Sequence, residues 1–494
     1  MTRRLLRTEV CVIGSGAGGA PVAKELAAAG VRVALLEEGP WHDPATFDRR
    51  PRDMALALYR DGGQLATLGD PPVVVPLGRG IGGTTLVNSG TCFRTPEAVL
   101  ARWRDELGLD WDLEDCFARV ERTIGVAEVP EALAGRNALL VRDGAARLGL
   151  SGGFLRRNAT GCRGSGVCAF GCPTGAKRHV GASYVEPARA AGATIVTGAR
   201  VTRVVAHGAG PHEVRARMAD GGRLRVLAER VVVACGTLLT PALLRRSGLG
   251  GASGQLGRNL SLHPASAARA RFDEVVDQWR GVPQSYYVDE LAGDGIMLEG
   301  IAGPPDQAAM STPLSGAAHR EWMLDARRTA SFGVMVCDSA RGSVREMPTR
   351  PARPLVRYDL HAEDARRFQR GFALLADIWW AAGAREIAVP LAGVPVLRDG
   401  DSSPLTRARV RPRDVAAMAF HPLGTARAGA DPATSVVGPD LALHGVEGVY
   451  VADGSVVPAP PGVNPQVTIM ALATRLAFAL LGRACPASYE PLIA

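Results

Sequence analysis

The sequence predicts an α/β protein organised around a dinucleotide-binding, Rossmann-like βαβ unit at its start. An apolar run over residues 10–13 leads into Gly14, Gly16 and Gly19, which have the G-x-G-x-x-G spacing. Apolar residues then recur at helical intervals over 20–27, and a second apolar run ends at Glu37. Strand, glycine turn, helix, strand and acidic residue in this order are the pattern of a dinucleotide-binding fold.

Each part of this unit has a role in holding a dinucleotide. Gly14 permits the tight turn, Gly16 lets the backbone approach a pyrophosphate, and Gly19 allows the helix to pack closely on the strand. The N-terminus of the helix then receives the phosphates, and the Glu37 carboxylate accepts hydrogen bonds from ribose hydroxyls. This unit alone does not separate FAD from NAD.

Composition excludes several classes of protein. The 494 residues are 47% hydrophobic and 21% charged, an ordinary composition for a globular protein of about two or three domains. The net charge of +8 comes from scattered arginines, since Lys24 and Lys177 are the only lysines, and no basic run predicts binding to nucleic acid. Nine dispersed cysteines, an odd number, argue against a disulfide framework and for a reducing compartment.

Neither end of the sequence predicts export or a membrane span. Residues 1–7 are basic, but no separate apolar region or cleavage site of a signal peptide follows them. The apolar stretch 467–481 is interrupted by Arg475 and is shorter than the roughly 20 apolar residues that cross a bilayer. We therefore expect a cytoplasmic protein without a membrane span.

A second glycine-rich stretch, residues 78–90, contains Gly83 and ends in Leu86-Val87-Asn88-Ser89-Gly90. Its glycines are too dense for a strand or a packed helix, so we expect its backbone to lie against a flat or phosphorylated group. Here the sequence resembles the glucose-methanol-choline (GMC) family of FAD-dependent oxidoreductases, nearest its cholesterol oxidase and long-chain alcohol oxidase branch. The resemblance implies that Gly83 and Asn88 contact FAD. Members that tether FAD covalently carry a histidine before this asparagine, so Val87 implies noncovalent FAD, at least at that position.

Three cysteines follow in residues 162–173, a segment similar to the ferredoxin run C-x2-C-x2-C-x3-C-P. Ser165 stands where the second cysteine belongs, which leaves Cys162, Cys168 and Cys172 as a poor cluster site. A zinc site lacks a fourth ligand apart from His179. A similar block occurs in the long-chain alcohol oxidase-like branch, and we interpret it as a loop with small buried cysteines. Whether it binds a metal or cluster stays open, and we assign no metal ligand.

Strands are predicted over 193–196, 199–206 and 224–234. The resemblance implies that backbone at Val201 contacts the adenine, and that Asp453 and Gly454, at the end of a strand over 446–452, lie near the ribityl or pyrophosphate part of FAD. This second block favours FAD over NAD.

The resemblance is weakest in the middle of the chain, and this divides it into domains. We expect an FAD-binding domain over residues 1–265 and 412–494, and a substrate-binding domain of antiparallel sheet and helices over 266–411. A strand over 332–338 and a helix over 365–381 are predicted within the substrate-binding domain.

His421 and Asn464 are the predicted catalytic residues. They stand in His421-Pro422-Leu423-Gly424-Thr425 and Asn464-Pro465-Gln466-Val467-Thr468, two blocks that resemble family segments facing the flavin. An imidazole is suited to take an alcohol proton, and an amide can orient the oxygen without adding charge. The implied reaction oxidises a CH–OH group to an aldehyde or ketone by hydride transfer to flavin N5. Electrons then pass to O2 or an external acceptor.

Alternatives stay open at this point. A GMC-fold lyase or photodecarboxylase uses FAD without oxidising an alcohol, and a non-enzymatic dinucleotide sensor belongs to another class altogether. We expect His263 to be structural, and Glu299 to be solvated unless it is a second acid or base. Five further side chains are expected in the core rather than in a substrate pocket: Tyr286, Tyr287, Met297, Trp322 and Met323. The alcohol, the electron acceptor and the oligomeric state are not predicted.

Overall fold

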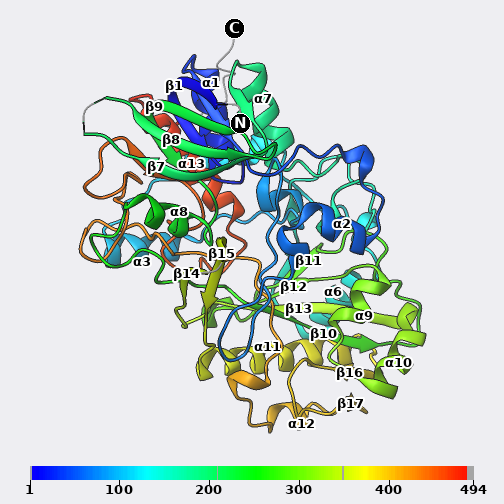
Figure 1. Cartoon of the computed structure of the whole chain (residues 1–494). Coiled ribbons are helices and arrows are strands. Elements are labelled where there is room, and N and C mark those ends of the chain that lie inside the picture. The colour runs from blue at the N-terminus through cyan, green and yellow to red at the C-terminus, as the bar shows by residue number, and fades with distance from the viewer. Residues whose placement is uncertain (1–2, 209, 348–349, 487–494) are drawn as a thin grey trace.

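Two sheets of seven strands each organise the chain, one toward each end of the molecule in Figure 1. The structure, a computed structural model, describes residues 3–208, 210–347 and 350–486. The mixed α/β architecture predicted from the sequence is confirmed. In the described part of the chain, no helix is long and apolar enough to cross a membrane.

The first sheet is built on the predicted βαβ unit. Its strands lie in the order β6 (Thr194–Val196), β2 (Val33–Leu36), β1 (Arg3–Ile13), β9 (Arg223–Val233), β8 (His212–Met218) and β7 (Ala199–Val205). β1 pairs in parallel with β2 and β9, and β18 (Val449–Val451) pairs in parallel with the last three residues of β9. The strands predicted around β6, β7 and β9 are confirmed, whereas the prediction missed β8.

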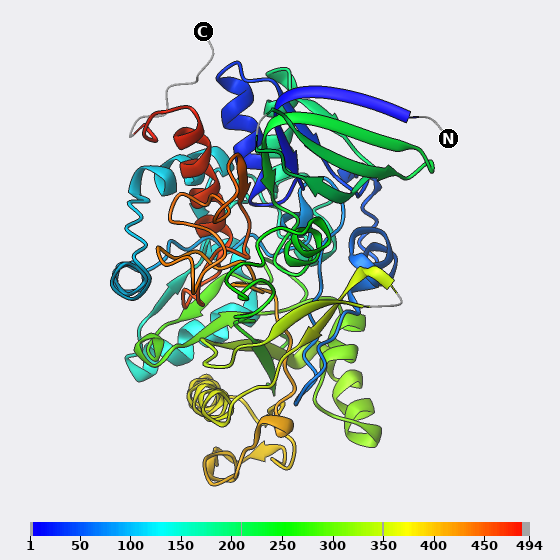
Figure 2. The same ribbon diagram turned by 60° about the vertical axis from the view of Figure 1, so that its left-hand side comes forward.

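Three helices pack together beside this sheet. α1 (Gly19–Ala28) follows the glycine turn and lies next to α13 (Gln466–Leu480), which in turn contacts α4 (Glu114–Ile124). The two views agree in placing α13, in red, beside α1, in blue (Figure 2). Arg119 of α4 joins the three helices, because its guanidinium pairs with Glu25 of α1 at 2.7 Å and lies 5.1 Å above the ring of Phe478 in α13.

The second sheet is antiparallel throughout. Its order is β17 (Leu397–Arg398), β16 (Glu386–Ala388), β10 (Ala265–Arg271), β13 (Thr329–Val336), β12 (Ile296–Gly300), β11 (Tyr286–Val288) and β4 (Gly152–Phe154). α11 (Ala362–Ala381) and α6 (Arg136–Leu148) cover one face. The strand and the helix predicted over 332–338 and 365–381 correspond to β13 and α11. The domain ranges stay a prediction, and β4 joins this sheet from outside residues 266–411.

Side chains alternate across the second sheet. On β10, Ala268 and Ala270 belong to the core shared with α11 and α6, whereas Ala267 and Arg269 line a cavity on the opposite face. The sheet therefore has a dry face under the helices and a face that bounds the cavity.

The remaining helices and strands belong to neither seven-stranded sheet. They are α2 (Pro51–Leu58), α3 (Glu97–Leu107), β3 (Ala127–Glu128), α5 (Glu131–Ala134), β5 (Arg156–Arg157), α7 (Glu186–Ala190), α8 (Thr240–Ser247), α9 (Pro305–Ser311), α10 (Gly316–Leu324), β14 (Ser343–Met347), β15 (Arg350–Arg357) and α12 (Ser403–Thr406). The helical pattern predicted for residues 96–150 corresponds to α3, α4 and α6.

Candidate active site

A cavity of about 1640 Å³ extends from the glycine turn of the first sheet to the open face of the second. Cavities that hold one drug-sized ligand measure about 300–1,000 Å³, so this one has room for a dinucleotide and a substrate together. It is lined by all the predicted site residues except Gly19: Gly14, Gly16, Glu37, Gly83, Asn88, Val201, His421, Asp453, Gly454 and Asn464.

The glycine turn leaves no space for side chains. Gly14 has φ +104°, and a Cβ atom there would lie 2.2 Å from the carbonyl oxygen of Ala234. Gly19 serves packing, since its Cβ would lie 2.0 Å from the Gly14 oxygen. Sequence reasoning did not single out Gly18, where a Cβ would lie 1.5 Å from the Ala452 oxygen. Close contact of this turn with the segment after β18 leaves glycine as the residue that fits.

The N-terminus of α1 is open to an anion. Among the described residues no side chain caps it, and its first turn contains no acidic residue. The N–H of Ala20 donates to the Gly16 oxygen at 3.1 Å and Pro21 has no N–H, so the Gly19 end of the helix and the positive end of its dipole are what this turn offers to phosphate oxygens.

Glu37 is held against the turn by three donors. Its Oε2 accepts from the backbone N and the Oγ of Ser15 at 3.1 and 2.7 Å, and its Oε1 accepts from the backbone N of Gly39 at 2.8 Å. Burial raises the pKa of Glu37, while these three hydrogen bonds act in the opposite direction. The carboxylate lines the cavity with lone pairs left over, which fits the predicted ribose acceptor.

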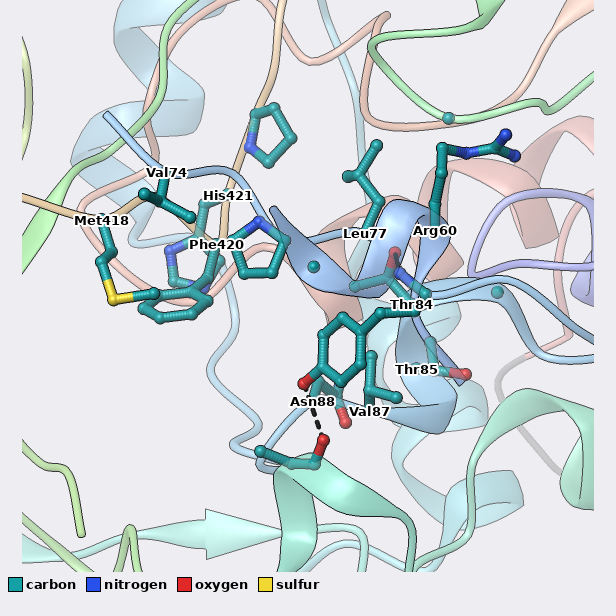
Figure 3. Close-up of a pocket in the computed structure, with 18 of the residues that line it drawn as sticks. Arg60, Val74, Leu77, Thr84, Thr85, Val87, Asn88, Met418, Phe420 and His421 are labelled. Atoms are coloured by element: carbon teal, nitrogen blue, oxygen red, sulfur yellow. Dashed lines mark hydrogen bonds between the residues drawn. The ribbon is translucent and has the colours of Figure 1, made fainter. Parts of the chain in front are cut away.

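The two glycine-rich stretches meet in the cavity wall. Gly83 has φ +53°, and a Cβ there would lie 3.0 Å from the Cα of Gly16. Figure 3 shows Thr84, Val87 and Asn88 along this second stretch, with His421 on the opposite side of the cavity. The Val87 side chain is buried among apolar neighbours. Because both glycine-rich stretches expose backbone without side chains here, they can lie against a flat group that bears phosphates.

Lys177 anchors the second glycine stretch from behind. Its Nζ donates to the carbonyl oxygens of Leu86, Asn88 and Cys168 at 2.9, 2.6 and 2.8 Å. Burial lowers the pKa of this amine to about 8. Asn88 is tied a second time, because its Nδ2 donates to the Oε1 of Gln466 at 2.8 Å. The sequence alone assigned no role to Lys177. The one feature that sets it apart there is that it is one of only two lysines in the chain.

Asp453 joins the ends of two parallel strands. Its Oδ2 accepts from the backbone N of Gly236 at 2.9 Å and the Oγ1 of Thr240 at 2.5 Å, and its Oδ1 accepts from the backbone N of Ser455 at 2.8 Å. These donors lie just after β9 and β18, and β7, which carries Val201, belongs to the same sheet. The roles predicted for Asp453, Gly454 and Val201 toward FAD stay predictions.

His421 and Asn464 lie together on the far side of the cavity. The Nε2 of His421 is 3.4 Å from the Nδ2 of Asn464, which donates to the Oε2 of Glu299 at 3.2 Å. The Nε2 of Gln284 donates to the same Glu299 oxygen at 2.9 Å. The His421 Nδ1, the Asn464 Oδ1 and the Glu299 Oε1 are buried and have no hydrogen-bond partner among the described residues.

The electrostatics of this group follow from burial. Loss of solvent lowers the pKa of His421 to about 4, because burial disfavours the imidazolium. It raises the pKa of Glu299 to about 7, although the hydrogen bond from Asn464 opposes that shift. At neutral pH the imidazole is therefore a neutral acceptor, and Glu299 is close to its titration midpoint. A role for Glu299 as a second acid or base stays a prediction, and nothing local in the sequence indicates its contact with Asn464.

His263 is a neighbour of the site and does not line the cavity. Its ring centroid lies 5.3 Å from that of His421, and its backbone N donates to the Oδ1 of Asp338 at 3.1 Å. Burial holds its pKa well below the usual value. The five side chains expected in the core, Tyr286, Tyr287, Met297, Trp322 and Met323, are also absent from the cavity lining.

The three cysteines of the ferredoxin-like segment have separate partners. The Sγ of Cys168 accepts from Arg157 Nη2 at 3.2 Å, the Sγ of Cys162 accepts from a backbone N at 3.4 Å, and Cys172 contacts Thr174. Within the described ranges, no three histidine, cysteine or acidic side chains are grouped so that they can hold a metal ion.

Comparison with known proteins adds independent information. Two family models, both described as GMC oxidoreductase, match residues 55–265 and 338–473. A GMC-type oxidoreductase of Mycobacterium tuberculosis is 44% identical over 477 residues, which cover 95% of this chain and 75% of that protein. A long-chain-alcohol oxidase of Arabidopsis thaliana is 28% identical over 508 residues, 95% of this chain and 68% of that protein.

Solved structures share the fold. A pyridoxine 4-oxidase from Mesorbium loti superposes with a TM-score of 0.76 at 20% identity, over 96% of this chain and 99% of that chain. A fungal aryl-alcohol oxidase superposes with a TM-score of 0.65 at 18% identity, over 95% of this chain and 98% of that chain.

Proposed function

Because the chain belongs to the GMC oxidoreductase family, we propose that it oxidises an alcohol to an aldehyde or ketone with noncovalently bound FAD. The observation that carries this proposal is the contact of His421 with Asn464 at 3.4 Å, inside the cavity that Gly14 and Gly83 also line. A base and a neutral hydrogen-bond donor are the two groups that removal of an alcohol proton needs. The names of the plant relatives, long-chain-alcohol oxidases, support an alcohol as the substrate.

The cavity fits FAD. The turn at Gly14–Gly19 and the open N-terminus of α1 suit a pyrophosphate, Glu37 suits the adenosine ribose, and the loop at Gly83–Asn88 suits a flat ring system. When bound there, FAD supplies the acceptor for the two electrons of the alcohol. Val87 has no nucleophilic atom, which supports noncovalent binding at that position.

His421 acts as the base in this proposal. Its imidazole is neutral at pH 7, so Nε2 can accept the proton of a substrate hydroxyl. The Nδ2 of Asn464 has two hydrogen atoms, of which Glu299 accepts one. The other is directed toward Nε2 of His421 at 3.4 Å, so a hydroxyl oxygen that binds beside both groups can donate to the imidazole and accept this amide hydrogen in its place. Glu299 acts through Asn464 as a positioning residue.

Anaerobic mixing of the purified flavoprotein with a panel of primary, secondary and aromatic alcohols tests the proposal. We expect at least one class of alcohol to bleach the flavin absorbance and to yield one aldehyde or ketone per FAD. Admission of air, and separately of an artificial acceptor, then distinguishes an oxidase from a dehydrogenase. A flavin that no alcohol reduces would contradict the proposal and leave a lyase or a photodecarboxylase. Tight binding of NAD in place of FAD, without turnover, would favour a sensor.

A further inference from the structure

A buried arginine without an acidic partner lies in the substrate end of the cavity. Arg269 on β10 is 5% exposed and lines the cavity on the open face of the second sheet. Its Nη1 donates to the Oε1 of Gln278 at 3.2 Å and its Nη2 to the Oγ of Ser311 at 2.6 Å. Both partners are neutral, and the buried Nε has no partner among the described residues.

A second arginine of β10 has the carboxylate partners that Arg269 lacks. Arg271 makes ion pairs with Glu321, Asp325 and Glu386, at 2.7, 3.1 and 2.7 Å. No carboxylate of the described chain lies within ion-pair distance of Arg269. A buried cation without a counter-ion is costly, so such groups are usually paired or serve a ligand.

Arg269 keeps its charge despite this environment. Burial lowers the pKa of its guanidinium to about 10, which leaves it protonated at neutral pH. Guanidinium groups bind carboxylate and phosphate oxygens through two parallel N–H donors, and the unpartnered Nε–H is one donor of such a pair. The open cavity beside it is the place where the missing negative charge fits.

We propose that Arg269 binds an anionic group of the substrate, so that the alcohol this protein oxidises is an acid: a hydroxy carboxylate, or a phosphate or sulfate ester with a free hydroxyl. This inference rests on the proposed alcohol oxidation and specifies its substrate class. Arg269 is a specificity residue in this account, and His421 and Asn464 remain the groups at the reacting carbon.

Strand register gives the approximate distance between the backbone positions of the two groups that would bind the substrate. Ala265, at the start of β10, exchanges two backbone hydrogen bonds with Met418, three residues before His421. Arg269 is four residues further along the strand, which at about 3.4 Å per residue is about 14 Å. The anionic group therefore binds at the end of β10 remote from His421.

A second path across the sheet agrees with this distance. Glu299 and Ala267 both lie opposite Gly333, on the two strands that flank β13. Two strand spacings of about 4.8 Å, and two residues along β10 to Arg269, place the Cα atoms of Glu299 and Arg269 about 12 Å apart. A hydroxyl and an anion at the ends of an extended chain fit this backbone separation better than the adjacent groups of a 2-hydroxy acid.

The surface between these ends consists mostly of small and apolar residues. The cavity wall there includes Ala267, Gly333 and Met335 of the sheet, with Ser331 beside Arg269 and Met418 near His421. Such a wall suits a hydrocarbon chain, because it offers apolar contact and few hydrogen bonds. The substrate that fits best carries its hydroxyl and its anion at opposite ends of an apolar chain.

The test compares substrates of one chain length. We expect kcat/KM for flavin reduction to be about 10- to 100-fold higher with ω-hydroxydecanoate, or with decanediol monophosphate or monosulfate, than with decanol, as charge-assisted hydrogen bonds imply. Comparison of kcat/KM among the carboxylate, phosphate and sulfate substrates shows which kind of anion the site prefers. A wild-type enzyme that prefers decanol to all three anions would overturn the proposal. If neither decanol nor any anion reduces the flavin, the proposed oxidation itself is contradicted.

Variants assign the preference to one side chain. Arg269→Met should reduce the ratio of kcat/KM for ω-hydroxydecanoate over decanol by about 10- to 100-fold, and Arg269→Lys should retain part of the ratio. Arg271→Met, which also removes an arginine of β10, should keep the wild-type ratio because its partners lie outside the cavity. A ratio unchanged in Arg269→Met, or lost equally in Arg271→Met, would contradict the assignment.

Binding without turnover gives an independent readout. Decanoate lacks a hydroxyl, so its affinity, measured from the perturbation of the flavin spectrum, does not depend on the reaction. We expect its Kd to rise about 10- to 100-fold in Arg269→Met and less in Arg269→Lys. Equal decanoate affinity in the wild type and Arg269→Met would overturn the anion site, even if alcohols reduce the flavin. Where Arg269→Met does not fold, the comparison of Arg269→Lys with the wild type decides.

Discussion

Replacing Glu299 by glutamine should change how the stability of this protein depends on pH. Glu299 is 5% exposed and accepts two N–H groups, from Asn464 and Gln284, on a single oxygen. Burial raises its pKa from 4.5 to about 7. At about 1.36 kcal/mol per pKa unit, this shift corresponds to about 3 kcal/mol of folding free energy.

The sign of the effect follows from proton binding. Because the folded state holds the Glu299 proton more tightly than the unfolded chain, the wild type loses stability as pH rises from about 4.5 to about 7. Above that range the whole cost of a buried carboxylate is present. A glutamine retains an oxygen for the donors from Asn464 and Gln284 and does not ionise. Glu299→Gln should therefore gain up to about 3 kcal/mol over the wild type at pH 8 relative to pH 4.5.

Thermal unfolding of the FAD-loaded proteins at both pH values measures this difference. We expect the Tm of Glu299→Gln to exceed that of the wild type by about 3 °C more at pH 8 than at pH 4.5, given the unfolding entropy of a chain of this length. Glu106→Gln, which removes an exposed carboxylate on α3, is the matched control and should show little change with pH. A Tm difference between Glu299→Gln and the wild type that is the same at both pH values would refute the reasoning, because Glu299 would then titrate as in water.

Three further predictions concern the walls of the cavity and its protonation. Lys177→Met leaves three buried carbonyl oxygens without their donor, at about 1–3 kcal/mol each, so it should lower both the Tm and the FAD content after purification. Gly18→Ala places a Cβ 1.5 Å from a carbonyl oxygen and should abolish FAD binding in absorbance spectra, whereas Gly30→Ala, with nothing within 4 Å, should cost only about 1–2 kcal/mol. In rapid-mixing experiments, kcat/KM for flavin reduction should rise with pH through a midpoint near 7 to a plateau above about pH 8 as Glu299 ionises, and Glu299→Gln should lack that step. A step that persists in the variant would assign it to another group.

The parts of the fold that local sequence pattern specifies were predictable. The βαβ unit combines an apolar strand, glycine spacing and a helix within about 30 residues, as such units do, and α11 shows the helical recurrence of apolar residues expected of a helix packed on a sheet. In contrast, β8 reads His-Glu-Val-Arg-Ala-Arg-Met, in which charges on the exposed face obscure the apolar alternation. β10 reads Ala-Ser-Ala-Ala-Arg-Ala-Arg, whose residues favour helices, and sheet pairing on both sides overrides that preference.

Residues of the candidate site were predictable only where they belong to a recognisable sequence motif. His421, Asn464 and the glycine stretches were found because their neighbours repeat recognisable blocks. Glu299 and Arg269 have no such blocks, and each acquires its environment from pairing of β12 and β10 with β13. Burial of a charged side chain is a property of tertiary structure, so a single sequence does not distinguish these two residues from solvated ones.

Anaerobic flavin reduction by an alcohol in His421→Ala tests the central claim most directly. The variant should purify with wild-type FAD content, because His421 contributes no contact to the glycine turn, and its reduction rate should fall by about 10²- to 10⁴-fold. His263→Asn, which removes the neighbouring imidazole at a position with φ +47° that asparagine tolerates, should reduce at a rate close to the wild type. A His421→Ala enzyme that an alcohol reduces as fast as the wild type would contradict the account.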